Sequence, residues 1–235
     1  MNYLIYLPFG VLPSIIWLGF YLRKDSHPES NLMILKIFFY GMLTALPAAL
    51  LEMGILGELN KLGLSEILTI ILYFFFGVAL VEEGIKYLVV RDKVLNNLEF
   101  DEPTDAMLYM IIAALGFATL ENILVLFSLG DTSPPLTIFW VTGFRFVGAT
   151  FLHALASGTI GYFLAISIFS KKRKEGLIIL GLAISTILHG LYNFSIMELS
   201  PFLKLLVPFA ILVVLAIFVS WGFNRLKKLK SVCLS

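Results

Sequence analysis

Apolar residues follow one another along this chain in long continuous runs, and short polar segments separate the runs. Each run is close to the 20 or so apolar residues that a helix needs to cross a bilayer. The runs are continuous and do not alternate, which excludes a membrane β-barrel. Because irregular backbone cannot face lipid, we expect an all-α polytopic membrane bundle. The runs predict seven membrane-spanning helices, at about residues 3–22, 32–56, 64–90, 105–128, 138–169, 176–196 and 202–222.

The composition agrees with a membrane protein and excludes several other classes. Of the 235 residues, 59% are hydrophobic and 14% are charged, whereas soluble domains are about 45–50% apolar and about 25% charged. The mean hydropathy is +0.94. A net charge of +1 argues against a nucleic-acid-binding protein, and the single Cys233 excludes a cysteine-based zinc site. We interpret residues 1–235 as one integral-membrane domain with the lipid bilayer as its surroundings.

Basic residues near the ends of the spans predict the orientation, because cytoplasmic loops are rich in Lys and Arg. With the N-terminus outside, only Lys61 and Lys204 face the exterior. The seven spans therefore predict an N-out, C-in protein of a bacterial or archaeal inner membrane. The cytoplasmic set is Arg23, Lys24, Arg91, Lys93, Lys171, Lys172, Arg173, Lys174, Arg225, Lys227, Lys228 and Lys230.

Ionisable residues inside the spans are the candidates for chemistry. Each costs about 2.5–3.5 kcal/mol on insertion scales, so an embedded cluster indicates function. Lys36 and Glu52 lie nearer the ends of the second span, and snorkelling toward the headgroups accounts for both. The embedded residues are Glu82, Glu83, Lys86, Glu121, Arg145, His153 and His189.

The third and fourth spans supply the carboxylates. Lys86 follows Glu82 by four residues and Glu83 by three, so on a helix its ammonium can reach either carboxylate. Two adjacent carboxylates in a low-dielectric site do not both ionise cheaply, which makes one of them a candidate general acid or base. In the fourth span, Glu121 stands beside Asn122. This pair could orient a water or a peptide group, or could tie helices together.

The fifth and sixth spans supply the imidazoles. Arg145 and His153 are eight residues apart and share a broad helix face, from which Arg145 could neutralise a carboxylate. His189 and Asn193 are four apart and lie on one face, as an acid–base group and an oxyanion-binding amide would. Helix rise places both histidines about 20–25 Å from the cytoplasmic span ends, and both glutamates only about 12–14 Å. These depths match only if the third helix continues into the cytoplasm.

Three functions are compatible with these residues. A carboxylate could activate water for hydrolysis without a metal, or zinc could bind His153, His189 and Glu121 while a glutamate serves as base. No His-Glu-x-x-His motif is present, and we favour the form without a cofactor. From another class of protein, a proton- or cation-coupled transporter would also use embedded charges. The absence of an internal repeat weakens the transporter alternative.

The order of the motifs resembles that of the PrsW family of intramembrane proteases, a family distantly related to the CAAX prenyl proteases. The resemblance covers about residues 78–196 and four successive helices. The motifs are Glu-Glu-x-x-Lys (Glu82, Glu83, Lys86), Phe-x-x-x-Glu-Asn (Phe117, Glu121, Asn122), Arg and His (Arg145, His153) and His-x-x-x-Asn (His189, Asn193).

The resemblance implies hydrolysis of a peptide bond in a single-pass membrane protein, of which an anti-sigma factor is the best-known type. It implies essential roles for Glu82, Glu83 and His189. By analogy with the CAAX proteases, Glu82 would activate the water, while His189 and Asn193 would bind the oxyanion. This chain departs from the CAAX pattern in having Glu121 in place of a histidine. We therefore expect Glu121 and His153 near the reaction, with Lys86, Asn122 and Arg145 in support.

Overall fold

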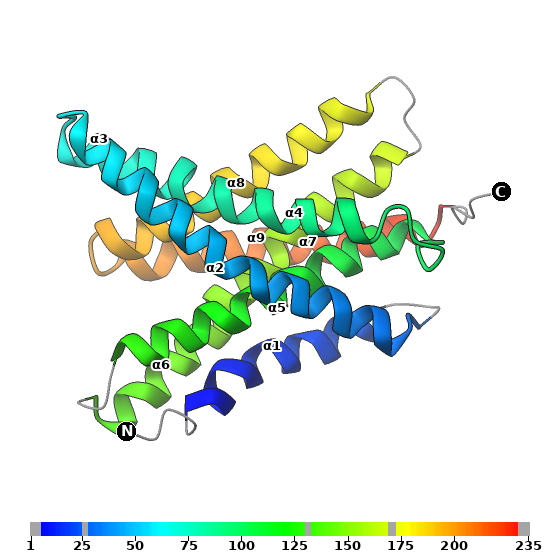
Figure 1. Ribbon diagram of the computed structural model, residues 1–235, viewed down its shortest axis with the longest axis horizontal. Helices are drawn as coiled ribbons and strands as arrows, with labels where there is room; N and C mark the ends of the chain where they lie inside the picture. Colours follow the sequence, from blue (N-terminus) through cyan, green and yellow to red (C-terminus); the bar gives the residue numbers. More distant parts are fainter. Residues whose placement is uncertain (1–5, 25–27, 130–132, 169–172, 230–235) are drawn as a thin grey trace.

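The computed structural model describes residues 6–24, 28–129, 133–168 and 173–229, and within these ranges the chain is helical without a strand (Figure 1). This confirms the predicted all-α membrane bundle. The elements are α1 (Tyr6–Leu22), α2 (Asn31–Lys61), α3 (Glu66–Leu72), the π-helix η2 (Tyr73–Ala79), α4 (Leu80–Lys93), α5 (Pro103–Leu129), α6 (Pro135–Val147), α7 (Ala149–Ile168), α8 (Lys174–Glu198) and α9 (Leu203–Leu226).

Six helical stretches of the described chain are long and apolar enough to cross a membrane, and each coincides with a predicted span. The first predicted span corresponds to α1, whose 17 residues make it shorter than the others. The count of seven crossings and the N-out orientation therefore stay predictions. The stretches are 31–61, 66–93, 103–129, 136–168, 174–198 and 203–226.

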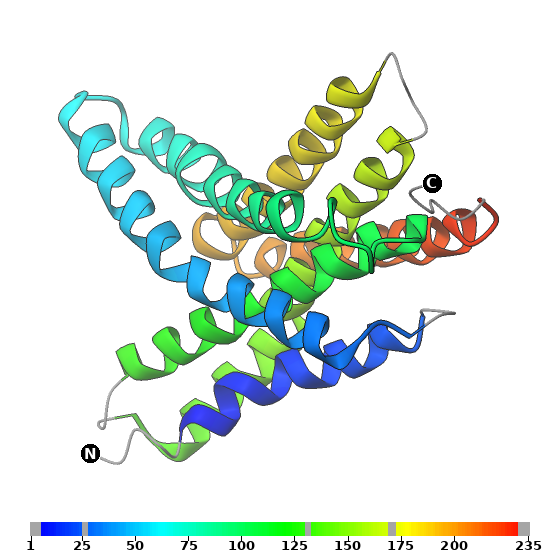
Figure 2. The same cartoon turned by 45° about the vertical axis from the view of Figure 1, so that its right-hand side comes forward.

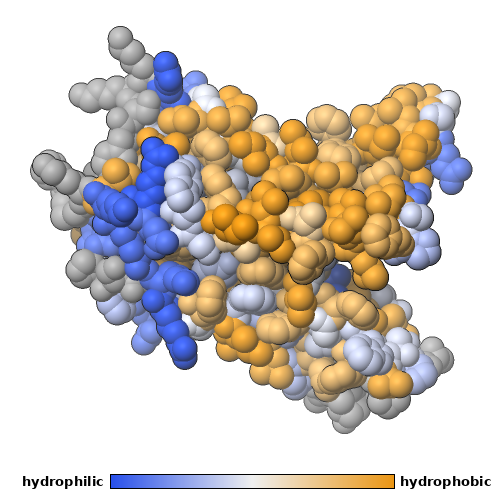
Figure 3. Space-filling view, turned by 180° about the vertical axis from the view of Figure 1, so that it is seen from behind, coloured by the Kyte–Doolittle hydropathy of each residue, from blue (hydrophilic) through white to orange (hydrophobic). Residues whose placement is uncertain are grey.

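The face seen in Figure 3 has a hydrophilic band at one end and is otherwise largely apolar. The ends of α1, α4 and α9 and the start of α8 lie at the banded end (Figure 1). Most of the predicted cytoplasmic basic set belongs to these ends, while Lys171, Lys172 and Lys230, like Cys233, lie outside the described residues. Along α9, Leu205, Phe209 and Ile217 are exposed, as lipid-facing residues would be.

The centre of the bundle is α5, which is buried around its whole circumference from Pro103 to Thr119. A helix that is apolar on every side is expected in the interior. Helix α5 packs most extensively against α7, α2 and α1. Glycines bring α2 and α5 into backbone contact: a Cβ at Gly116 would lie 1.9 Å from the carbonyl oxygen of Phe38, and one at Gly41 would lie 2.0 Å from that of Ala113.

Gly116→Ala is expected to destabilise the bundle, because the added methyl collides with backbone that cannot rotate away. Overpacking of this kind costs about 1–3 kcal/mol, and occasionally more. Thermal unfolding in detergent, followed by circular dichroism, should show a lower midpoint than in the wild type. Gly54→Ala on α2 is the matched control, since its Cβ would meet no atom within 4 Å. A Gly116→Ala protein that unfolds at the wild-type temperature would contradict this packing.

Two predicted spans are interrupted in the structure. The third contains η2, which ends three residues before Glu82, and π-helical turns occur frequently at functional sites. The fifth is divided at Gly148 into α6 and α7. A Cβ at Gly148 would lie 2.3 Å from the hydroxyl of Tyr192, so this close approach of α8 requires glycine.

The helices cross at steep angles and diverge at the end opposite the hydrophilic band. The second half of α2, with α3, spreads away from the end of α5 and from α6 (Figures 1 and 2). From behind, the apolar surface is hollowed between two lobes at this end (Figure 3). The ionisable residues of α4, α5, α7 and α8 come together where these helices cross.

Candidate active site

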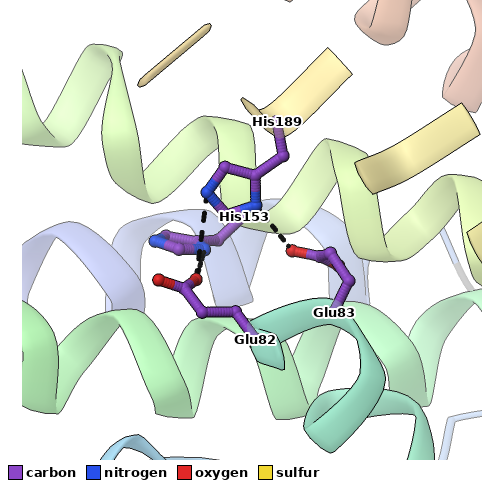
Figure 4. A group of neighbouring side chains, drawn as sticks. All are labelled: Glu82, Glu83, His153 and His189. Atoms are coloured by element: carbon purple, nitrogen blue, oxygen red, sulfur yellow. Dashed lines mark hydrogen bonds and ion pairs between the residues drawn. The ribbon is translucent and has the colours of Figure 1, made fainter. Parts of the chain in front are cut away.

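Four of the predicted residues form one buried cluster. Glu82 and Glu83 come from α4, His153 from α7 and His189 from α8 (Figure 4). Each offers a nitrogen or oxygen atom that lies within 4.8 Å of the others, and all four side chains are buried. Two adjacent glutamates therefore meet two imidazoles from different helices inside an apolar bundle.

Lys86 lies among three members of this cluster. Its Nζ atom is 3.1 Å from Oε2 of Glu82, 2.8 Å from Oε1 of Glu83 and 2.9 Å from Nδ1 of His153. An ammonium group has three N–H donors, so all of them are used. The ring of Phe117 covers the ammonium at 4.4 Å from its centroid, a favourable cation–π arrangement. The side chain of Lys86 is fully buried.

The contact with Lys86 determines which nitrogen of His153 carries a proton. Because Nδ1 accepts from the ammonium, a neutral His153 holds its proton on Nε2. Nε2 lies 2.7 Å from Oε2 of Glu121, to which it can donate. Oε1 of Glu121 in turn pairs with Nη2 of Arg145 at 2.9 Å. Glu121 therefore fixes the orientation of His153 from the side away from the other glutamates.

Arg145 and Asn122 join three helices behind this pair. Nε of Arg145, on α6, donates to Oδ1 of Asn122, on α5, at 2.6 Å. The amide of Asn122 donates to the hydroxyl of Thr150, on α7, at 3.0 Å. These contacts connect α5, α6 and α7 beside Glu121.

The two glutamates of α4 differ in how fully their oxygens are engaged. Oε1 of Glu83 accepts from Lys86 and from Nδ1 of His189, and Oε2 accepts from Ser157 at 2.7 Å. Glu82 accepts from Lys86 through Oε2 only, and its Oε1 has no hydrogen bond to a described residue. Glu83 is thus held by three partners, while Glu82 keeps one oxygen available for a substrate or a water.

His189 directs one ring nitrogen at each glutamate (Figure 4). Nδ1 lies 3.0 Å from Oε1 of Glu83, so it carries the proton of that contact. Nε2 lies 3.8 Å from Oε2 of Glu82, beyond hydrogen-bond distance. Asn193 is one turn further along α8, is half-buried, and makes no hydrogen bond to the described part of the chain.

Two residues near the cluster were not among the predicted ones. Ser157 binds Glu83, and its position one turn after His153 is the sequence signal that could have indicated this. Glu52 was assigned to the headgroup region, yet α2 continues to Lys61. Glu52 is half-buried and lies one turn after Ala48, which belongs to a buried cluster with Phe117. We therefore include Glu52 among the acidic groups around the cluster.

The register of α2 explains why Glu52 faces this site. Ala48, one turn earlier, is fully buried in a cluster that includes Phe117. One turn after Glu52, the side chain of Ile55 would lie 3.2 Å from a Cβ at Gly77 of η2. Residues 48, 52 and 55 lie on one helix face, which is the face turned toward η2 and α5.

The cluster contains suitable ligand types for a metal ion, but its members are not the predicted set of zinc ligands. Two carboxylates and two imidazoles are suitable ligand types for zinc, but this group includes Glu82 and Glu83 and omits Glu121. It therefore differs from the predicted zinc set of His153, His189 and Glu121. The ammonium of Lys86 lies within hydrogen-bond distance of three of the four residues. The ammonium of Lys86 therefore occupies contacts that a metal ion bound by these four residues would need.

An apolar multi-helix bundle that encloses carboxylates, imidazoles and an ammonium is a membrane protein with an embedded acid–base centre. The family model described as "PrsW family intramembrane metalloprotease" matches residues 29–221. The chain belongs to this family and is a membrane protease. This favours the protease over the transporter alternative and confirms the family predicted from the motifs.

Curated relatives agree with the family assignment. The chain is 30% identical to the protein named Protease PrsW of Oceanobacillus iheyensis over 206 residues, which are 86% of this chain and 88% of the relative. It is 29% identical to Protease PrsW of Bacillus subtilis over 229 residues, covering 95% and 94% of the two chains. No solved structure matches the chain.

Proposed function

We propose that this chain is an endopeptidase of the cell membrane that hydrolyses a peptide bond of a single-pass membrane protein, such as an anti-sigma factor. The observation that carries the proposal is the placement of Glu82 in a buried cluster: its Oε1 has no hydrogen bond to a described residue, and its Oε2 lies 3.8 Å from Nε2 of His189. The nature of the substrate follows from the family resemblance. The reaction below uses only residues of this chain.

Glu82 is the proposed general base. Its unengaged Oε1 takes a proton from a water molecule, and the resulting hydroxide attacks the carbonyl carbon of the substrate. The proton then passes from Glu82 to the leaving nitrogen as the C–N bond breaks, which leaves a new carboxylate and a new amine. Lys86 holds the other oxygen of Glu82 during these steps.

His189 is the proposed oxyanion donor. When protonated, its Nε2–H can donate to the oxyanion while Nδ1–H stays bonded to Glu83. Asn193, one turn away, can approach the same oxygen through its amide. A protonated His189 also balances the hydrogen-bonded core, in which Glu82, Glu83 and Glu121 otherwise face only two cations.

A substrate reaches the cluster most directly past Glu121 and Arg145. Their side chains are 32% and 18% exposed, whereas those of the two glutamates of α4 are at most 5% exposed. The two residues belong to α5 and α6, which border the divergent end of the bundle (Figure 2). We therefore propose that the substrate chain approaches from this end.

The test is cleavage by the purified chain in liposomes. Single-pass substrates with different extramembrane segments are incorporated, and the products are identified by mass spectrometry. We expect one or more substrates to be cut within or beside the membrane segment. Folded protein that cuts no member of a broad panel, but carries protons or cations across the same liposomes, would contradict the proposal.

A further inference from the structure

We infer that the Lys86 ammonium is the resident cation of the active site and that it prevents the glutamate–histidine cluster from binding a divalent metal ion. The inference deepens the proposed function and rests on it for the role of the cluster in cleavage. The family is described as a metalloprotease family, whereas an ammonium group lies among the residues that would bind the metal.

The ammonium has the position and the partners that a bound cation would have. Its three N–H groups contact one atom each of Glu82, Glu83 and His153, at distances from 2.8 to 3.1 Å. These are three of the four residues whose donor atoms converge. The charge is supplied by the same helical turn that supplies the two carboxylates, so it is fixed by the fold of α4.

The remaining donor atoms are too few for a metal centre. Both nitrogens of His153 are engaged, one by Lys86 and the other by Glu121. Both oxygens of Glu83 are engaged as well. In the described cluster, Nε2 of His189 and Oε1 of Glu82 are the atoms that remain free to coordinate a metal ion. A catalytic zinc site uses three protein ligands, so two are insufficient.

Departure of the lysine from this place is opposed by its surroundings. The side chain of Lys86 is fully buried, and the ring of Phe117 covers the ammonium. Moving the group would remove the cation that the buried carboxylates of Glu82 and Glu83 share, which is costly. Lys86 is thus a positioning residue: it holds Oε2 of Glu82 and Nδ1 of His153 at once, and thereby orients the free oxygen of Glu82.

Cobalt binding tests this inference without reference to activity. The full chain is purified in detergent as wild type, Lys86→Ala and Lys61→Ala, and Co²⁺ is titrated while its visible absorption is recorded. Lys61 is an exposed lysine at the end of α2 and serves as the matched control. Metal content is then measured after removal of free ions.

We expect the wild type and Lys61→Ala to bind no cobalt specifically. Lys86→Ala should bind about one ion per chain with an intense tetrahedral spectrum, because the deletion frees atoms of Glu82, Glu83 and His153. Adding His189→Ala to Lys86→Ala should weaken the binding and alter that spectrum, because one of the four converging ligands is then missing. Stoichiometric binding by the wild type would overturn the inference, and this outcome does not depend on whether any variant folds. A folded Lys86→Ala that gains no metal would overturn it too.

Cleavage measured on the same wild-type samples separates the inference from the proposed function. If the wild type binds no metal and cuts substrate in the presence of a chelator, both stand. If it binds cobalt and loses cleavage on chelation, the inference fails while the protease stands. If it binds no metal and cuts no member of the substrate panel, the inference stands and the proposed function fails.

Discussion

Replacing Glu82 by glutamine is expected to lower kcat for peptide cleavage about 10³-fold, within the range of 10²–10⁴ that a positioned general base contributes. Glutamine has the same shape and still accepts a hydrogen bond from Lys86, but it cannot take a proton from water. The loss corresponds to about 4 kcal/mol in activation free energy. Because the fold around Lys86 and Glu83 is unchanged, substrate binding should be largely retained.

Single-turnover cleavage of a membrane substrate, with enzyme in excess, measures this effect. Glu58→Gln is the matched control: it makes the same chemical change on an exposed residue of α2, whose pairing with Lys61 contributes little. That variant should cleave at the wild-type rate. Glu82→Gln protein that is folded and keeps more than about a tenth of the wild-type rate would exclude Glu82 as the base.

Replacing His189 by glutamine is expected to lower kcat about 10²–10³-fold, the usual cost of removing one oxyanion donor. The donor contact forms only as negative charge develops on the substrate oxygen. KM should therefore change little, since an interaction restricted to the transition state affects kcat and kcat/KM equally. Asn193→Ala should act in the same direction, with a smaller effect if the amide shares the oxyanion.

Steady-state kinetics in liposomes separates this role from substrate binding. Circular dichroism and the thermal midpoint serve to establish that the variant is folded, since His189 also donates to Glu83. An increase in KM with kcat unchanged would assign His189 to substrate binding. Unchanged kinetics in folded protein would remove His189 from the mechanism.

Apolar patterning was sufficient to predict the elements of the bundle, but it did not predict where they break. A span is defined by a run of apolar residues, and both η2 and Gly148 lie inside such runs. Gly148 lies against the hydroxyl of Tyr192 from α8, and Gly77 of η2 lies against Tyr73 and Ile55. Contacts between distant segments decide these features, so local pattern does not contain them.

Depth estimated from helix rise was a poor guide to the site. It placed the glutamates of α4 nearer the cytoplasm than His153 and His189, yet these residues meet. The estimate treats the helices as parallel rods of equal tilt, whereas they cross at steep angles (Figures 1 and 2). Embedded charge was the better signal, because burying an ionisable group is costly unless it has a partner.

The sequence predicted which residues form the buried cluster better than it predicted which residue each of them contacts. The spacing of Glu82, Glu83 and Lys86 correctly indicated their ion pairs. The contact of Lys86 with His153 joins α4 to α7. The spacing of residues within one helix does not predict such a contact between two helices. The span containing Glu52 is predicted to end at residue 56, whereas α2 extends to Lys61, so Glu52 lies further from the helix end than the pattern indicates.

The most direct test of the central claim is cleavage of a single-pass substrate in water enriched in ¹⁸O, followed by mass spectrometry of both fragments. If Glu82 activates water, the new carboxyl terminus made by the wild type should carry the label, and folded Glu82→Gln should form the two fragments about 10³-fold more slowly. Formation of the same labelled fragments by folded Glu82→Gln at more than about a tenth of the wild-type rate would contradict the account.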